Sequence, residues 1–147
     1  MTKNKRRKRI LFVCIHNSAR SQMAEAMVNN LWGERFEAIS AGFSPAPLNP
    51  LAIEVMQEWN MDISRKQSQS VFELFRKGQL VDYVITVCDE AGAEQCPVFP
   101  GITRRLHWSF PDPALFGGTH EERLHEARIL RNSIKARLEE WMGQLED

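Results

Sequence analysis

The stretch of sequence that decides the fold is residues 9–32, which read RILFVCIHNSARSQMAEAMVNNLW. Residues 9–13 are a short run rich in branched side chains that ends at Cys14, a pattern typical of a strand. Over residues 19–32 the pattern changes to helical spacing, with one apolar stripe made by Met23, Met27 and Leu31. The stretch therefore predicts a strand, a tight loop that contains a cysteine and an arginine, and a helix.

Strands and helices continue to alternate along the rest of the chain. Runs of branched and aromatic side chains predict further strands at 36–40, 80–87 and 104–108. Helix caps are expected at Asn49 and at Thr119, where Glu122 stands at capping-box spacing. This succession of βα units predicts an α/β fold, a single three-layer domain with a small, about four-stranded, parallel sheet flanked by helices.

The chain has 147 residues, which is the length of one ordinary domain. Nineteen basic residues balance 19 acidic ones, but six basic residues lie within the first nine positions, so residues 10–147 carry a net charge of −6. We expect residues 1–8 to be a basic, flexible N-terminal arm and residues 9–147 to form the domain. The arm is of the kind that is usually solvated, and nucleic-acid binding is not expected.

No stretch of the sequence predicts a membrane segment. The longest apolar run, residues 10–15, is far shorter than the roughly 20 residues that span a bilayer, and it is too short for a secretory signal. The three cysteines, Cys14, Cys88 and Cys96, are odd in number and widely spaced, unlike a secreted disulfide framework. These features predict a cytoplasmic protein whose thiols are available for chemistry.

The loop after the first predicted strand has the composition of an anion cradle. Loop amides and the first N–H groups of a helix favour bound oxyanions, and the same field favours a thiolate at Cys14. The planar guanidinium of Arg20 can hold two oxygens of a tetrahedral anion. Ser21 can donate to the sulfur, and Asn17 can tie the backbone of the loop together. The predicted oxyanion-binding residues are Ile15, His16, Asn17, Ser18, Ala19, Arg20 and Ser21.

Residues 13–25 resemble the signature of the low-molecular-weight protein tyrosine phosphatase superfamily, and specifically of its thioredoxin-coupled arsenate reductases. Residues 40–42, Cys88 and Cys96 with Pro97, and residues 108–114 are similar to later motifs of that family in the right order. The resemblance covers nearly the whole chain from Arg9 onward. The loop from Cys14 to Arg20 is shared with the phosphatases of the superfamily. The two further cysteines, Cys88 and Cys96, resemble those of the reductases in particular.

The resemblance implies a redox enzyme without a bound cofactor that reduces arsenate to arsenite in arsenic detoxification. Cys14 would attack arsenate, Cys88 would attack the resulting adduct, and Cys96 would then form a redox-active disulfide with Cys88. Asp112, held between two prolines, would be the general acid. Thioredoxin would supply the electrons, although glutaredoxin with glutathione stays open as the reductant. A monomer is the expectation for the family.

Two other functions remain open at this point. The first is a phosphatase that hydrolyses phosphate monoesters through a Cys14 phosphoenzyme, and weak phosphatase activity is expected in any case. Against it, the only tyrosine, Tyr83, lies inside a predicted strand and not at a pocket rim. The second is a non-catalytic sensor of oxyanions or redox state.

Some members of the family bind potassium near the loop, through side chains that here would be Asn17, Glu25 and Ser40. Further ligands follow the second helix, where this chain reads Gln67-Ser68-Gln69 without an acidic residue. We therefore expect no metal site.

Overall fold

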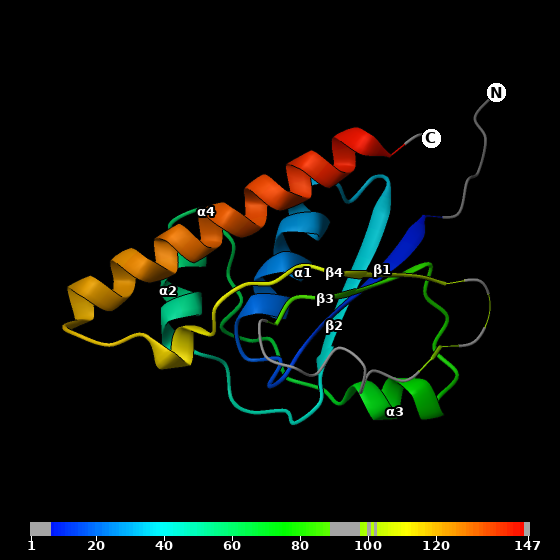
Figure 1. Cartoon of the computed structure of the whole chain (residues 1–147), viewed down its shortest axis with the longest axis horizontal. Helices are drawn as coiled ribbons and strands as arrows, with labels where there is room; N and C mark the ends of the chain where they lie inside the picture. The colour runs from blue at the N-terminus through cyan, green and yellow to red at the C-terminus, as the bar shows by residue number, and fades with distance from the viewer. Residues whose placement is uncertain (1–6, 89–97, 100, 102, 146–147) are drawn as a thin grey trace.

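Four parallel strands form the only sheet in the part of the chain that the structure describes. The computed structural model describes residues 7–88, 98–99, 101 and 103–145. The strands lie in the order β2-β1-β3-β4, as Figure 1 shows, and all neighbouring pairs are parallel. Their bounds are Lys8–Cys14 for β1, Phe36–Gly42 for β2, Tyr83–Thr86 for β3 and Arg104–His107 for β4. The predicted four-stranded parallel sheet is confirmed.

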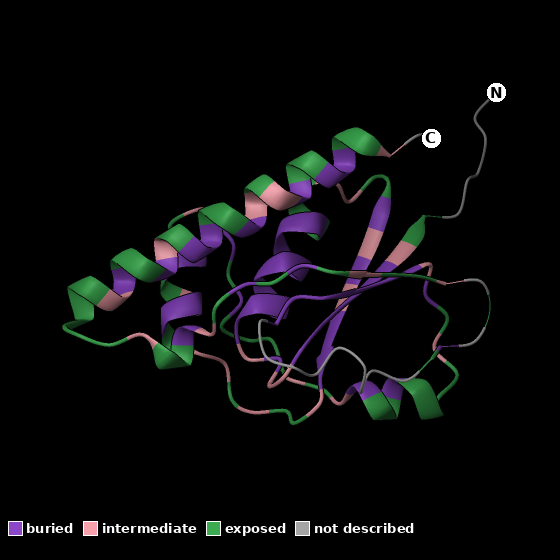
Figure 2. Cartoon of the chain, viewed as in Figure 1, coloured by how far each residue is buried: buried purple, intermediate pink, exposed green. Residues whose placement is uncertain are grey.

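Helices cover both faces of the sheet and complete the three layers (Figure 1). They are α1 (Arg20–Leu31), α2 (Pro50–Gln57), α3 (Val71–Arg76) and α4 (His120–Gln144), with a 3-10 turn η2 at Pro113–Leu115. Successive side chains of a strand point to opposite faces, so β1 feeds two cores. Ile10, Phe12 and Cys14 pack with α1, α2 and α4, while Leu11 and Val13 pack with α3. Every residue from Ile10 to Cys14 is buried (Figure 2).

The predicted caps form and fix where two helices begin. Asn49 Oδ1 accepts the Leu51 N–H at 2.8 Å at the start of α2. At the start of α4, Thr119 and Glu122 form the reciprocal capping box. In the described ranges, none of the helices is long and apolar enough to cross a membrane.

An ion-pair cluster ties α4 to the end of α2. Arg128 Nη2 lies 2.8 Å from Glu58 Oε2, and Arg131 Nη1 lies 2.7 Å from Glu58 Oε1. Hydrogen bonds from Arg128, and then from Arg131, lower the pKa of the Glu58 carboxyl from 4.5 to about 2. Arg131 also stacks on the Trp59 ring, with its guanidinium carbon 4.1 Å from the ring centroid. The longest helix is thus fixed over the face that carries α1 and α2.

Apart from shifts of one or two residues at the ends of β2 and β4, three details differ from the sequence-based prediction. Helix α3 was not predicted, because six residues are fewer than two turns and give little periodicity. Strand β3 is shorter than the predicted 80–87, since Leu80 is exposed and the Asp82 carboxylate accepts the Arg9 N–H at 2.8 Å. Lys8, placed in the arm by the prediction, is the first residue of β1, while residues 1–6 lie outside the described residues.

Candidate active site

Two hydrogen-bond donors converge on the sulfur of Cys14, the last residue of β1. The Asn17 N–H donates to Cys14 Sγ at 3.1 Å, and Ser21 Oγ lies 2.9 Å from the same sulfur. Asn17 Nδ2 donates to Ser21 Oγ at 2.7 Å, which leaves the hydroxyl hydrogen of Ser21 available for the sulfur. Both donors bind a thiolate more strongly than a thiol. The buried sulfur is therefore prepared to act as a nucleophile.

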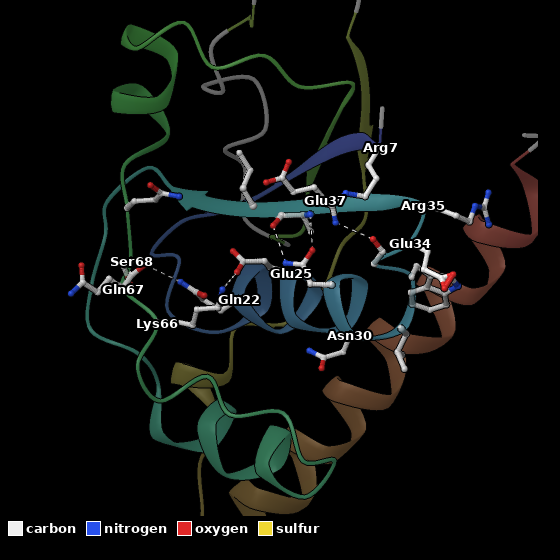
Figure 3. Close-up of a pocket in the computed structure, with 17 residues that line it drawn as sticks. Arg7, Gln22, Glu25, Asn30, Glu34, Arg35, Glu37, Lys66, Gln67 and Ser68 are labelled. Atoms are coloured by element: carbon white, nitrogen blue, oxygen red, sulfur yellow. Dashed lines mark hydrogen bonds and ion pairs between the residues drawn. The ribbon is translucent and has the colours of Figure 1, made fainter. Parts of the chain in front are cut away.

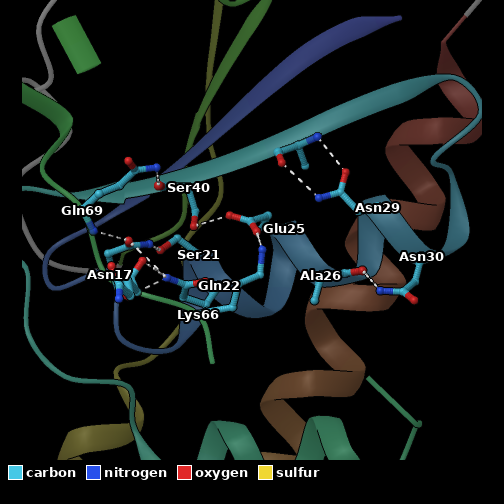
Figure 4. Close-up of polar contacts among 12 residues, drawn as sticks. Asn17, Ser21, Gln22, Glu25, Ala26, Asn29, Asn30, Ser40, Lys66 and Gln69 are labelled. Carbon is cyan, nitrogen blue, oxygen red and sulfur yellow. Dashed lines mark hydrogen bonds and ion pairs between the residues drawn. The ribbon is translucent and has the colours of Figure 1, made fainter. Parts of the chain in front are cut away.

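Asn17 holds the shape of the loop. Its backbone has a φ of 52°, in the left-handed region that asparagine tolerates better than most residues. Its side-chain oxygen accepts the Gln22 amide at 3.2 Å and the Gln69 N–H at 2.9 Å (Figure 4). The loop also presses against the end of β2, because a Cβ at Gly42 would lie 2.7 Å from the Asn17 nitrogen. These contacts fix the backbone conformation of the loop, and they keep the N–H of Asn17 directed at Cys14.

The start of α1 and Arg20 make the positive wall of the cradle. Ala19 is the N-cap of α1 and offers no side-chain cap, so the helix dipole and the first amides are available to an anion. Arg20 is 2% exposed, and its Nη1 donates to the Phe110 carbonyl at 3.1 Å. Its Nη2 lies 3.8 Å from Asp112 Oδ2. The arginine therefore links the cradle to the loop that carries the predicted acid.

The structure brings Asp112 to the site, with its side chain nearly buried. Asp112 is the N-cap of η2, where its Oδ1 accepts the Ala114 N–H at 2.9 Å. The cap fixes one carboxylate oxygen and leaves the other directed toward Arg20. A carboxyl group in this position can give a proton to an oxygen that leaves an anion bound by Arg20.

Cys88 follows by two residues the end of β3, the strand that pairs with β1. Strands β1 and β3 pair with Val13 opposite Thr86, and the Val87 N–H donates to the Val13 carbonyl at 2.8 Å. Continuing that register at ideal strand spacing would place the Cα atoms of Cys14 and Cys88 about 6 Å apart. Disulfides need about 4.4 to 6.8 Å between Cα atoms. Both cysteines are buried and neither is in a disulfide. Cys96 lies outside the described residues.

Behind the loop, the buried carboxylate of Glu25 is paired with the ammonium group of Lys66. Ser40 Oγ donates to Glu25 Oε1 at 2.7 Å, and the Lys66 ammonium forms an ion pair with Glu25 Oε2 (Figure 4). The residues present do not fit a potassium ion, because Lys66 compensates the charge of Glu25. Nor does any cluster of three or more His, Cys, Asp or Glu side chains suited to a metal occur among the described residues.

A groove of about 1050 Å³ lies beside β2 and α1, with Glu25, Lys66 and Ser68 among the residues that line it (Figure 3). Neither Cys14 nor Arg20 lines it. The amide of Asn29 fills part of this edge of β2, donating to the Ala38 carbonyl at 3.0 Å and accepting the Ala38 N–H at 2.8 Å. This groove is therefore separate from the cradle formed by Cys14 and Arg20.

The family of low molecular weight phosphotyrosine protein phosphatases matches residues 9–147. The chain belongs to this family. Within it, the chain is similar to an arsenate reductase of Shouchella clausii, with 38% identity over 92% of this chain and 95% of that protein. It is similar to the structure of an arsenate reductase in the phosphate binding state, with a TM-score of 0.75 and 26% identity over 95% of this chain and 99% of that chain. It is also similar to a thioredoxin-dependent arsenate reductase of Corynebacterium glutamicum, with a TM-score of 0.56 and 31% identity over 89% of this chain and 63% of that chain.

The sequence predicted which residues form the rest of this loop, but it did not predict all of their contacts. The predicted loop residues Ile15, His16, Ser18 and Ala19 all lie between β1 and α1. His16 turns away from the sulfur, and its Nδ1 lies 2.9 Å from the Ser44 carbonyl oxygen. Ser68 and Gln69 were not predicted to support the loop, because their contacts to Asn17 cross about 50 residues and leave no local pattern.

Proposed function

We propose that this protein is an arsenate reductase that moves two electrons from its own thiols to arsenic. The observation that carries the proposal is the pair of buried thiols, Cys14 and Cys88, at neighbouring strand ends beside an arginine-lined cradle. A phosphatase needs one nucleophilic thiolate, whereas reduction needs a second thiol to complete a disulfide. Arsenate has the charge and tetrahedral shape that the loop amides and Arg20 are arranged to hold.

In the first step the Cys14 thiolate attacks the arsenic of arsenate. A sulfur–arsenic bond forms and an arsenic–oxygen bond breaks. Asp112 gives its proton to the oxygen that departs, which leaves as water. Arg20 and the amides of the loop hold the remaining oxygens. Arsenic stays at oxidation state five through this step.

In the second step the Cys88 thiolate attacks the sulfur of Cys14. A sulfur–sulfur bond forms, the sulfur–arsenic bond breaks, and its electron pair stays on arsenic, which leaves as arsenite. The two thiols have lost two electrons and arsenic has gained them. The short separation expected between the strand ends allows this disulfide without a large movement of the sheet.

In the third step Cys96 attacks the sulfur of Cys88, which releases the Cys14 thiolate and leaves a Cys88–Cys96 disulfide. Thioredoxin then reduces that disulfide, and a monomer suffices for every step. The similar reductase of Corynebacterium glutamicum is named as thioredoxin-dependent, which supports this reductant over glutaredoxin with glutathione. Such a cycle belongs in the cytoplasm, where thiols are kept reduced.

Hydrolysis of phosphate esters would use the same first step, with water in place of Cys88. Phosphate has the shape and charge of arsenate, so weak phosphatase activity is part of the proposal. Tyr83, however, lies in β3 with its ring 5.0 Å from that of Trp141, edge to face. Ala114 and Leu115, not aromatic residues, follow the Asp112-Pro113 pair. Phosphotyrosine would therefore find no tyrosine from this chain to stack against.

A coupled assay tests the proposal. Arsenate, thioredoxin, thioredoxin reductase and NADPH are mixed with the wild type or with Cys96→Ala, and NADPH oxidation is followed. We expect sustained oxidation with the wild type and at most one turnover with Cys96→Ala. Sustained turnover by Cys96→Ala would overturn the third step. Efficient hydrolysis of an aryl phosphate without arsenate-dependent oxidation by either protein would make the protein a phosphatase.

A further inference from the structure

An apolar strip lies exposed on the face of the sheet that α3 covers. We define the α3 strip as Phe72, Phe75 and Val98, whose side chains are 39%, 41% and 75% exposed. Helix α3 turns Val71 and Leu74 toward the sheet and these two phenylalanines outward, so its outer face is exposed in Figure 2. Phe72 and Phe75 lie three residues apart on α3, and exposed apolar side chains that gather in this way are candidates for an interaction site.

The strip is supported from beneath by two further rings. The Phe72 ring lies 6.2 Å from that of Phe43, and the Phe75 ring lies 5.9 Å from that of Phe99, edge to face. Phe99 is itself buried. The exposed rings therefore stand on a packed base, which holds them in place before any partner arrives and lowers the entropy lost on binding.

One end of the strip adjoins the catalytic loop. The Phe43 N–H donates to the Cys14 carbonyl at 3.2 Å, so the ring that supports Phe72 belongs to a residue bound to the catalytic cysteine. Ser70, which caps α3, pairs with Gly42 at the end of β2. Helix α3 thus begins at the carboxyl edge of the sheet, where the thiols lie.

Val98 is close in the sequence to the last thiol of the proposed relay. Val98 follows Cys96 by two residues, and two residues of chain span at most about 7 Å. A protein that binds Val98 and the two phenylalanines is therefore within reach of the disulfide it must reduce.

We propose that the α3 strip is the docking surface for thioredoxin, an inference that rests on the proposed function. A thioredoxin thiolate attacks the sulfur of Cys96 in the Cys88–Cys96 disulfide, forming a mixed disulfide and releasing the Cys88 thiolate. The second thioredoxin thiol then breaks the mixed disulfide, which releases the Cys96 thiolate and leaves oxidised thioredoxin. Transient redox complexes bury less than about 1,200 Å² in total. A few large side chains can form the centre of an interface of that size.

The test replaces Phe72 and Phe75 together by serine and compares this variant with a matched control, Leu31→Ser with Ile129→Ser. The control residues have similar exposure, 45% and 47%, but lie on α1 and α4. Arsenate turnover is measured with increasing thioredoxin and, separately, with dithiothreitol as the reductant.

We expect the phenylalanine variant to raise the KM for thioredoxin at least tenfold and to leave turnover with dithiothreitol unchanged, while the control changes neither. A second variant, Phe72→Leu with Phe75→Leu, keeps the surface apolar and should restore most of the thioredoxin KM if the first variant is poorly folded. An unchanged thioredoxin KM in the serine variant would overturn the docking surface alone. Failure of thioredoxin to support the wild type, when dithiothreitol does, would overturn the thioredoxin step and the docking surface with it.

Discussion

Ser21→Ala removes one of the two donors that converge on Cys14 and is the sharpest test of the site's electrostatics. When Cys14 is a thiolate, the Ser21 hydroxyl donates to its Sγ across 2.9 Å, and the Asn17 N–H supplies the other bond. Alanine deletes the first bond and keeps the second. The thiolate of the variant is therefore less stabilised relative to the thiol, while the cradle and Arg20 stay in place.

The size of the effect follows from the strength of a hydrogen bond to a charged group, about 1.5 to 3 kcal/mol. With 1.4 kcal/mol for each factor of ten, losing it removes a roughly 10- to 100-fold stabilisation of the thiolate. A sulfur with one hydrogen bond fewer is also a better nucleophile, with a Brønsted coefficient of about 0.4 to 0.5. The two effects oppose each other, and Cys14 should react about three to ten times more slowly than in the wild type.

The assay is the rate of Cys14 alkylation by iodoacetamide at neutral pH, followed by peptide mass spectrometry so that Cys88 and Cys96 are counted separately. Ser133→Ala is the matched control, because Ser133 donates to the Ile129 carbonyl at 2.8 Å on the exposed side of α4. The Ser21 variant should react about three to ten times more slowly than the wild type, and the Ser133 variant should match the wild type. An unchanged or faster rate in the Ser21 variant would refute the reasoning.

Three other predictions follow from the described contacts. Asp112→Asn should keep the cap of η2 but lower arsenate kcat by about a hundredfold or more, measured under saturating arsenate, because the amide cannot give a proton in the first step. Lys66→Met should lower Tm and arsenate turnover by leaving the nearly buried Glu25 without its cation, and Lys66→Met with Glu25→Gln should recover most of both in thermal melts and assays. Glu58→Gln should lower Tm at neutral pH; since folding lowers the pKa of Glu58 to about 2, its stabilisation is complete above about pH 4.5 and is lost toward pH 2, so the two melting curves should converge over that range.

The sheet and the catalytic loop could be predicted because their signals are local. A run of branched residues before Cys14 and helical spacing after Ala19 lie within 24 consecutive residues, and the backbone must turn between them. The same holds for the capping box at Thr119, where the two partners are three residues apart. Asp112 carried a local signal as well, through its flanking prolines and its place in a family motif.

The contacts that shape the loop could not be predicted, since they join distant parts of the chain. The Gln69 N–H reaches Asn17 across 52 residues, and Lys66 reaches Glu25 across 41. Neither residue type is unusual, and neither stands in a pattern that would single it out. Helix α3 was not predicted for a different reason, because its six residues give little periodicity, and its exposed Phe72 and Phe75 also break the rule that aromatic residues are buried. The residues that were hardest to predict from the sequence thus include Phe72 and Phe75, which are proposed to bind a partner.

The central claim is that Cys14 and Cys88 supply the electrons that reduce arsenic, and a single-turnover experiment tests it most directly. Fully reduced Cys96→Ser is mixed with excess arsenate without any external reductant. Arsenite is then quantified, and disulfides are mapped by mass spectrometry. The account predicts one arsenite for each chain, the loss of two thiols, and a disulfide between Cys14 and Cys88. Arsenite released while both thiols remain, or no arsenite from a protein that still binds the oxyanion, would contradict it.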